Sequence, residues 1–335
     1  MKNVALEDTS TTGITHRSVQ VGEIRMHIAE AGSGPLVVLL HGFPETWYSW
    51  RHQLLALAAA GYHAVAPDQR GYGRTELPDA VEDYTILHTV GDVIQLVDVL
   101  GEERAVLAGH DWGGVVTWHA ALMRPDVVRG VVSLSTPFQP HADGAHLAGL
   151  RAVAGADYEN YYSVYVQRPG VADEELGEDP RATVRRALYG ASGEGYPWSP
   201  IVPAGGHLLD IWPEPGELPG WLTEQDIDTV AEDFARTGFT PALNWFRNFD
   251  RNWALTSPWH NAVITQPALY ITGDRDLAAK LPGAAELIEG RSAAVPHARE
   301  AIVLPGCGHW IQQERSDDVS RAMISFVRSL APWRT

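Results

Sequence analysis

Short apolar runs recur along the chain, and several are separated by segments with a helical pattern. Leu36–Leu40 is apolar at every position, and this lack of alternation predicts a strand buried on both faces of a parallel sheet. Similar runs occupy His63–Ala66, Arg104–Ala108, Gly130–Leu134, Ala268–Thr272 and Ala301–Leu304, and helical patterns occupy Trp47–Ala60, Thr85–Leu100 and Gly113–Met123. The alternation predicts an α/β fold with a mostly parallel sheet, helices on both faces and function at the carboxyl ends of the strands.

Two regions depart from this alternation. Near the start, Thr15–Gln20 and Ile24–Ala31 predict an antiparallel hairpin. We expect the residues before Thr15 to be frayed. Between Gln139 and Trp253 the chain has few strand-like runs, many aromatic residues, acidic helical pieces and a Gly/Pro-rich loop. We therefore expect a mainly helical lid over residues 139–254, inserted between two parts of a sheet domain, residues 1–138 and 255–335.

The composition narrows the possible partners and the compartment. The net charge of −17 argues against nucleic acid or an anionic membrane as a partner, because both reward basic patches. The single cysteine, Cys307, cannot form an intrachain disulfide and fits a reducing cytoplasm. The polar N-terminus lacks an apolar signal core, and no run approaches the roughly 18 apolar residues of a membrane span. We expect a cytoplasmic protein; the sequence does not predict its oligomeric state.

The segment Gly109–Gly113 has the context of a nucleophile elbow. It follows one apolar run and precedes a helical pattern, with Asp111 at its centre and glycines two residues before and after it. In such an elbow the central residue adopts a strained backbone conformation, and its side chain projects above the sheet. The alternative is an ordinary loop aspartate that caps the following helix. By itself the segment does not separate the two interpretations.

A carboxylate at the apex predicts a particular chemistry. A carboxylate is a weak nucleophile suited to displacement at a saturated carbon, which leaves an alkyl ester on Asp111. Water then hydrolyses that ester at the carboxyl carbon of the aspartate. The substrate should therefore carry an sp3 carbon with a leaving group, such as an epoxide or an alkyl halide.

Residues His41–Pro44 directly follow the Leu36–Leu40 run. In an elbow enzyme this loop supplies one backbone N–H of an oxyanion hole, here from Phe43, and Trp112, after the nucleophile, supplies the other. The alternative is a tight turn without a catalytic role. The next loop, Pro67–Arg74, is interpreted as structural.

Two late segments complete a possible catalytic set. Asp274 and Asp276 follow the Ala268–Thr272 run, and His309 follows the last run. The order nucleophile, acid, histidine is that of elbow hydrolases, so we expect His309 to act as general base with one of these aspartates orienting it. Cys307 is interpreted as a small packing residue, because nothing nearby lowers its pKa.

Taken together, these motifs resemble those of the soluble epoxide hydrolases of the α/β-hydrolase fold. The matching residues span roughly residues 15–330 and comprise His41-Gly42-Phe43-Pro44-Glu45, Pro67-Asp68-Gln69-Arg70-Gly71-Tyr72-Gly73, Gly109-His110-Asp111-Trp112-Gly113-Gly114, Asp276 and Gly308-His309-Trp310. The resemblance implies a cis Phe43–Pro44 bond, selects Asp276 over Asp274, and implies hydrolysis of an epoxide to a vicinal diol. No metal or cofactor is expected.

The lid carries both a match and a departure. Tyr162-Ser163-Val164-Tyr165 resembles the family segment whose first tyrosine donates a hydrogen bond to the epoxide oxygen, which implies that role for Tyr162. Phe246 stands where the family has its second tyrosine, and phenylalanine has no donor. Phe43, Trp112, Tyr162, Trp245, Phe246 and Trp310 suggest an apolar pocket for a small neutral epoxide.

Two other functions are compatible with these residues: one uses them for a different reaction, and the other does not use them for catalysis. A haloalkane-type dehalogenase shares Asp111 and His309, but Phe43 stands where such enzymes tend to have asparagine. A non-catalytic ligand-binding protein on this scaffold is the second alternative, because a fold alone does not establish activity. The presence of nucleophile, acid, base and both amide positions argues against this second alternative, because a retired site usually loses at least one of them.

Overall fold

A single mixed β-sheet forms the centre of the molecule. The computed structural model describes residues 6–9, 13–197, 199–281 and 283–330. Within them the sheet has the strand order β1-β2-β3-β5-β4-β6-β7-β8-β9. The strands are β1 (Leu6–Thr9), β2 (Thr15–Val21), β3 (Ile24–Ala31), β4 (Leu36–Leu40), β5 (His63–Pro67), β6 (Ala105–His110), β7 (Val128–Leu134), β8 (Ala268–Gly273) and β9 (Ile302–Leu304).

The strand directions agree with the prediction of a mostly parallel sheet. Strands β4 to β9 pair in parallel, β2 and β3 form the predicted antiparallel hairpin, and β3 also runs antiparallel to β5. The six apolar runs correspond to β4–β9, with ends shifted by at most two residues. The expectation of a frayed start is wrong for Leu6–Thr9, which pairs antiparallel with β2. This strand is short and polar, and its backbone pairing leaves little trace in the hydrophobic pattern.

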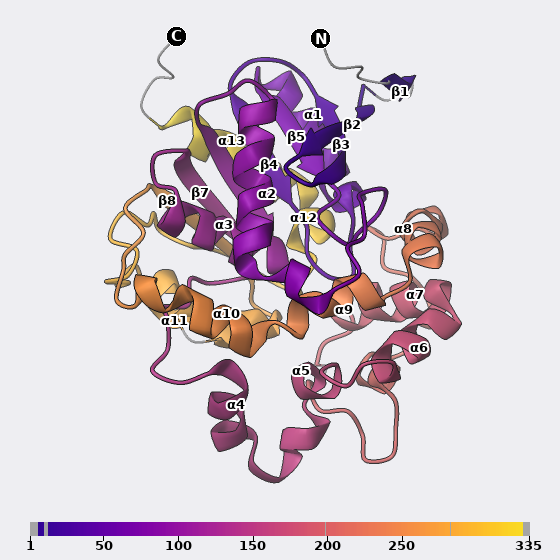
Figure 1. Ribbon diagram of the computed structural model, residues 1–335. Helices are drawn as coiled ribbons and strands as arrows, with labels where there is room; N and C mark the ends of the chain where they lie inside the picture. The colour runs from indigo at the N-terminus through magenta and orange to yellow at the C-terminus, as the bar shows by residue number, and fades with distance from the viewer. Residues whose placement is uncertain (1–5, 10–12, 198, 282, 331–335) are drawn as a thin grey trace.

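Helices cover both faces of the sheet, as predicted. Helices α2 (Ile86–Val99) and α3 (Trp112–Met123) pack with Leu36, Val38 and Leu40 of β4 in one core. Helices α1 (Arg51–Ala59) and α13 (Ser316–Arg328) pack with Val37 and Leu39 in the other (Figure 1). Successive side chains of a strand point to opposite faces, so all of Leu36–Leu40 is buried.

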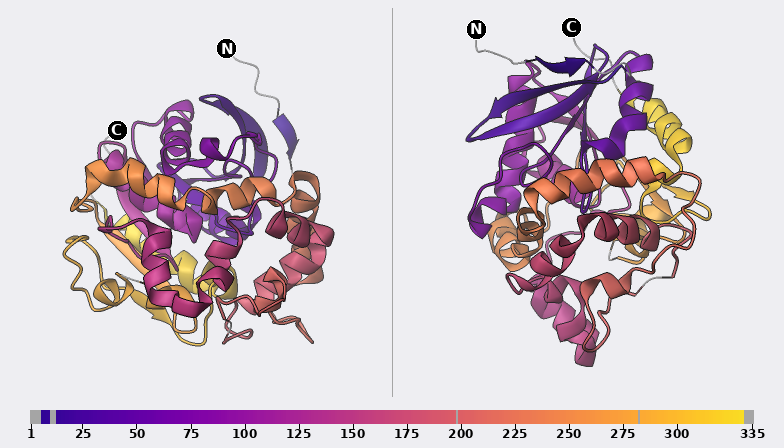
Figure 2. Two further views of the ribbon diagram at one scale, coloured as in Figure 1. Left: turned by 60° about the horizontal axis from the view of Figure 1, so that its bottom comes forward. Right: turned by 90° about the vertical axis from the view of Figure 1, so that its right-hand side faces the viewer.

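A largely helical segment connects β7 to β8, and its described part contains no strand. Its elements are α4 (His146–Ala154), η3 (Gly155–Asn160), α5 (Tyr162–Tyr165), α6 (Val171–Glu178), α7 (Pro180–Gly190), η4 (Leu208–Ile211), α8 (Glu224–Thr237), α9 (Thr240–Phe246), α10 (Phe249–Thr256) and η5 (Ser257–Trp259). In the right-hand view of Figure 2 these magenta-to-orange helices lie below the indigo strands. We propose that residues 139–254 form the lid; α10 continues slightly beyond that boundary.

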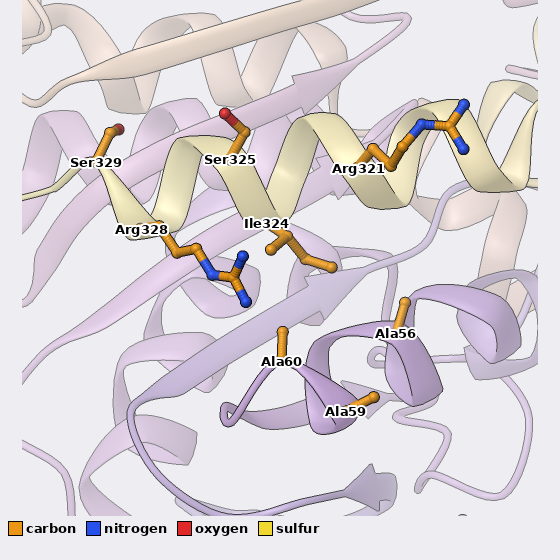
Figure 3. Close-up of a pocket in the computed structure, with 8 residues that line it drawn as sticks. All are labelled: Ala56, Ala59, Ala60, Arg321, Ile324, Ser325, Arg328 and Ser329. Carbon is orange, nitrogen blue, oxygen red and sulfur yellow. The ribbon is translucent and has the colours of Figure 1, made fainter.

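The remaining short elements are η1 (Trp47–Trp50), η2 (Val81–Tyr84), η6 (Leu277–Lys280), α11 (Ala284–Ile288) and α12 (Ile311–Glu314). Among the described helices, none is both long and apolar enough to cross a membrane. An open groove of about 660 Å³ lies between α1 and α13, where three alanines at the end of α1 lie opposite Ile324, Arg321 and Arg328 of α13 (Figure 3). None of the predicted site residues lines this groove.

Candidate active site

Asp111 occupies the sharp turn between β6 and α3. Its backbone has φ 51° and ψ −119°, a conformation that non-glycine residues rarely adopt. The turn needs glycine on both sides, because a Cβ at Gly113 would overlap the carbonyl oxygen of Leu40, and one at Gly109 would overlap the carbonyl of Gly113. The local geometry is therefore the elbow predicted from the sequence.

Each carboxylate oxygen of Asp111 has a different neighbour. Oδ1 accepts a hydrogen bond from the backbone N–H of Phe43 at 2.9 Å, and Oδ2 lies 3.6 Å from Nε2 of His309. The Phe43–Pro44 peptide is cis, which confirms that prediction. Trp112 is the first residue of α3, where a backbone N–H has no partner within the helix. The two predicted amide positions thus lie at the β4 loop and at the start of α3.

The acid beside His309 is Asp276. Its Oδ1 lies 3.1 Å from Nδ1 of the histidine and also accepts the N–H of Ala278 at 2.9 Å. Its side chain is 1% exposed, whereas 28% of the Asp111 side chain is exposed. Asp274 instead accepts the N–H of Gly306 at 2.8 Å. The structure therefore brings Asp276, rather than Asp274, to the histidine.

The charges at the site shift the pKa values of Asp111 and His309. Burial alone would raise the pKa of Asp111, but the interaction with the His309 imidazole outweighs burial and lowers it. Burial would likewise lower the pKa of His309, yet Asp276 and Asp111 together hold it well above its usual value. Before reaction, the arrangement therefore favours a charged imidazolium between two carboxylates.

The main chain of His309 is held at its carbonyl as well. This oxygen accepts hydrogen bonds from Nε2 of His110 at 2.8 Å and from Oγ of Ser135 at 2.9 Å. Nδ1 of His110 in turn lies 2.7 Å from Oε2 of the buried Glu45. Ser135 has a φ of 63° and is fully buried. Buried polar groups thus connect the histidine loop to strand β6 and to the loops that follow β4 and β7.

An aromatic wall adjoins the nucleophile. We give this name to Phe43, Trp112, Tyr162, Phe246 and Phe249. The ring of Phe246 lies 5.4 Å from Phe43, 5.1 Å from Trp112, 6.3 Å from Tyr162 and 5.9 Å from Phe249, edge-to-face in each case. This packing spacing is typical of favourable aromatic pairs. It brings lid side chains onto the core residues beside Asp111.

Burial raises the pKa of Tyr162, and the negative charge of Asp111 raises it further. The phenol therefore stays protonated at neutral pH. A protonated phenol can donate a hydrogen bond to an oxygen held against the aromatic wall.

Trp245 and Trp310 occupy deeper positions. The indole N–H of Trp245 donates to the carbonyl of Arg70 at 3.0 Å, and its ring packs behind Trp112 at 5.7 Å. Trp310 lies 4.9 Å from the ring of His309, and each indole is 2% exposed. The two side chains therefore pack against site residues, Trp245 against Trp112 and Trp310 against His309.

Two other interpretations can be compared with the structure. The loop after β5 makes structural contacts: Asp68 accepts the backbone N–H groups of Trp47 and Arg74 at 3.0 Å, and Arg70 forms a buried ion pair with Asp92 at 2.7 Å. Cys307 is buried, and burial raises the pKa of its thiol. Both observations agree with the sequence-based interpretations.

Sequence reasoning missed the residues that support the histidine and part of the aromatic wall. They are Glu45, His110, Ser135, Phe249 and Glu314. Glu45 and His110 lie inside quoted motifs but received no role. Glu314 stands four residues after Trp310, one residue beyond the spacing of a capping box, so that signal does not identify it. The partners of Ser135 and Phe249 left no sequence signal.

Known proteins agree with this geometry. The α/β hydrolase fold model matches residues 35–179, and the sheet order and the elbow define the protein as a member of that fold class. Epoxide hydrolase A of Mycobacterium tuberculosis (strain ATCC 25618 / H37Rv) is 42% identical over 324 residues, covering 94% of this chain and 98% of the relative. Epoxide hydrolase 1 of Siraitia grosvenorii is 42% identical over 318 residues, with the same coverage.

A solved structure gives the same result. The crystal structure of epoxide hydrolase A from Mycobacterium thermoresistibile has a TM-score of 0.88 and 43% sequence identity, covering 96% of this chain and all of that one. The chain belongs to the epoxide hydrolase family.

Proposed function

We propose that the protein hydrolyses epoxides to vicinal diols in two steps through an ester on Asp111. In the first step Oδ2 of Asp111 attacks a ring carbon, and the bond between that carbon and the epoxide oxygen breaks. Tyr162 donates a hydrogen bond to the departing oxygen, which becomes a hydroxyl by taking up, through solvent, the proton that the His309 imidazolium loses when Asp111 is esterified. Oδ1 keeps its hydrogen bond to the Phe43 amide and becomes the carbonyl oxygen of the ester.

In the second step His309 removes a proton from water, and the water oxygen adds to the carboxyl carbon of Asp111. The amides of Phe43 and Trp112 stabilise the resulting oxyanion. The bond between this carbon and the ester oxygen then breaks, and the protonated His309 returns a proton to the departing diol. The first diol formed carries an oxygen from Asp111, and the water oxygen stays in the aspartate.

The charges support this order of events. The pKa of His309 is raised by two carboxylates, but esterification removes the charge of one of them. The pKa of the histidine therefore falls once the ester exists, and the ring can then act as a base. Asp276 still faces Nδ1 and orients Nε2 towards the ester.

One observation carries the proposal: Asp111 stands at the elbow with one oxygen on the Phe43 amide and the other facing an imidazole backed by a buried carboxylate. The relatives named epoxide hydrolases support the choice of substrate class. The aromatic wall suits a small, neutral, apolar epoxide. We also propose a cytoplasmic location, since the single cysteine fits a reducing compartment.

Mass spectrometry of the H309Q protein after exposure to a panel of epoxides tests the first step. We expect an adduct on the peptide that contains Asp111. A single turnover of the unaltered enzyme in H₂¹⁸O tests the second, and we expect heavy oxygen in Asp111 and ordinary oxygen in the first diol. Heavy oxygen in the diol with none in the aspartate would contradict the ester mechanism. Assaying diol against halide release distinguishes this activity from dehalogenation.

A further inference from the structure

We propose that Glu314 is a positioning residue that joins the lid to the histidine loop and thereby supports the second step of the reaction. The proposal concerns the contact between the lid segment Ala191–Gly193 and the core segment Gly306–Trp310. It rests on the proposed two-step hydrolysis, because it assigns different effects to the two steps.

The carboxylate of Glu314 binds three backbone N–H groups. Its Oε2 accepts from Gly193 at 3.0 Å and from Gly308 at 2.8 Å, and its Oε1 accepts from Trp310 at 3.0 Å. Gly308 and Trp310 are the immediate neighbours of His309, whereas Gly193 belongs to the lid. One side chain therefore holds both flanks of the histidine and a lid residue together.

The two segments approach each other backbone to backbone. The N–H of His309 donates to the carbonyl of Ala191 at 2.9 Å. A Cβ at Gly308 would overlap the backbone of Ser192, and one at Gly193 would overlap the carbonyl of Gly306. The contact therefore requires glycine at both positions.

Glu314 reaches the chemistry only through the backbone. Its carboxylate binds three main-chain amides and also interacts with the buried thiol of Cys307; none of these groups belongs to Asp111, Tyr162 or the ring of His309. The oxygens of Asp111 are oriented by the Phe43 amide and by the elbow. The rate of attack on the epoxide should therefore change little on loss of Glu314, while proton removal by His309 should become slower.

Two variants test this separation. Glu314→Ala removes all three acceptor contacts. Glu314→Gln keeps one oxygen for Gly193 and Gly308 but turns an NH₂ group towards the N–H of Trp310. A displacement of the catalytic base by about 1 Å can cost on the order of a hundredfold in rate. We expect ester hydrolysis to slow by about ten- to a hundredfold in the Glu314→Ala variant. The Glu314→Gln variant should slow it by a smaller factor.

Single-turnover stopped-flow tryptophan fluorescence on the whole protein follows the two steps in time. Quenched-flow mass spectrometry of the Asp111 peptide measures the amount of ester. Both experiments use an epoxide that the unaltered enzyme turns over. We expect the alkylation rate to stay within about threefold, so the ester accumulates. In the steady state kcat and KM should fall together, and kcat/KM should change little, since it then reports the first step.

Tyr48→Phe is the matched control. It removes the 3.0 Å hydrogen bond from the phenol to Asp226 of α8, which is also a contact between core and lid, but it leaves residues 306–310 untouched. We expect a lower melting temperature without ester accumulation. A purely structural role for Glu314 would give this same pattern in the Glu314 variants.

The outcomes separate the inference from the proposed function. The positioning role is wrong if the unaltered enzyme forms the ester and, in the Glu314→Gln variant, alkylation and ester hydrolysis are slowed by the same factor or are both unchanged. This holds even if the Ala variant fails to fold, because Gln retains two of the three contacts. If the unaltered enzyme and H309Q form no ester at all, the two-step function itself fails.

Discussion

The substitution Tyr162→Phe tests how the epoxide ring is opened. The change removes one hydroxyl and keeps the ring, which lies 6.3 Å from Phe246 and 5.6 Å from Tyr161. The hydroxyl is the group that we propose to donate to the departing oxygen. Phe246 stands across from it in the aromatic wall and has no donor, so this residue cannot replace the lost phenol.

The expected magnitude follows from the charge that develops. A donor aimed at a developing oxyanion contributes about 10²–10³ in rate, or about 2.7–4 kcal/mol. Burial and the charge of Asp111 raise the pKa of the phenol, so the donor is fully protonated across the neutral range. We therefore expect the alkylation rate to fall by at least about a hundredfold.

The assay is the same single-turnover experiment that resolves the two steps. Only alkylation should slow in this variant, because the second step depends on His309, so little ester should accumulate. This is the opposite of the pattern expected for Glu314. An alkylation rate within about threefold of the unaltered enzyme would show that Tyr162 is not the donor, and that another group stabilises the departing oxygen.

Two further predictions concern the active site, and a third concerns a carboxylate in β3. Asp276→Asn should lower the pKa of His309, which NMR titration of the ring would detect, and slow ester hydrolysis by at least about a hundredfold; an unchanged titration would contradict the pairing. Phe246→Tyr in the Tyr162→Phe background should restore part of the alkylation rate, and no recovery would mean that the new hydroxyl does not reach the oxygen. For Glu30, burial raises the carboxyl pKa, but hydrogen bonds from a neighbouring histidine and arginine lower it from 4.5 to about 2. The stabilisation, about 3 kcal/mol, is present above pH 4.5 and is lost as the pH falls towards 2. The difference in unfolding free energy between Glu30→Gln and the unaltered protein in urea should shrink over that range, and a constant difference would refute this account.

The sequence by itself determined the order of the main strands and helices and the turn that carries the nucleophile. Leu36–Leu40 had to be a strand buried on both faces, because it offers no polar position to solvent. The glycines around Asp111 permit a turn that other residues would obstruct. Such features depend on neighbours within a few residues, and a local pattern is enough to predict them.

Tertiary structure decided which distant groups meet. The order of residues left Asp274 and Asp276 open, and the family resemblance implied Asp276; the packing of the β8 and β9 loops places its carboxylate against His309. The lid contact of Glu314 with Gly193 joins residues 121 positions apart. The crossover connections and the register between strands decide which of these distant residues come into contact. The spacing of residues within one segment encodes neither of them.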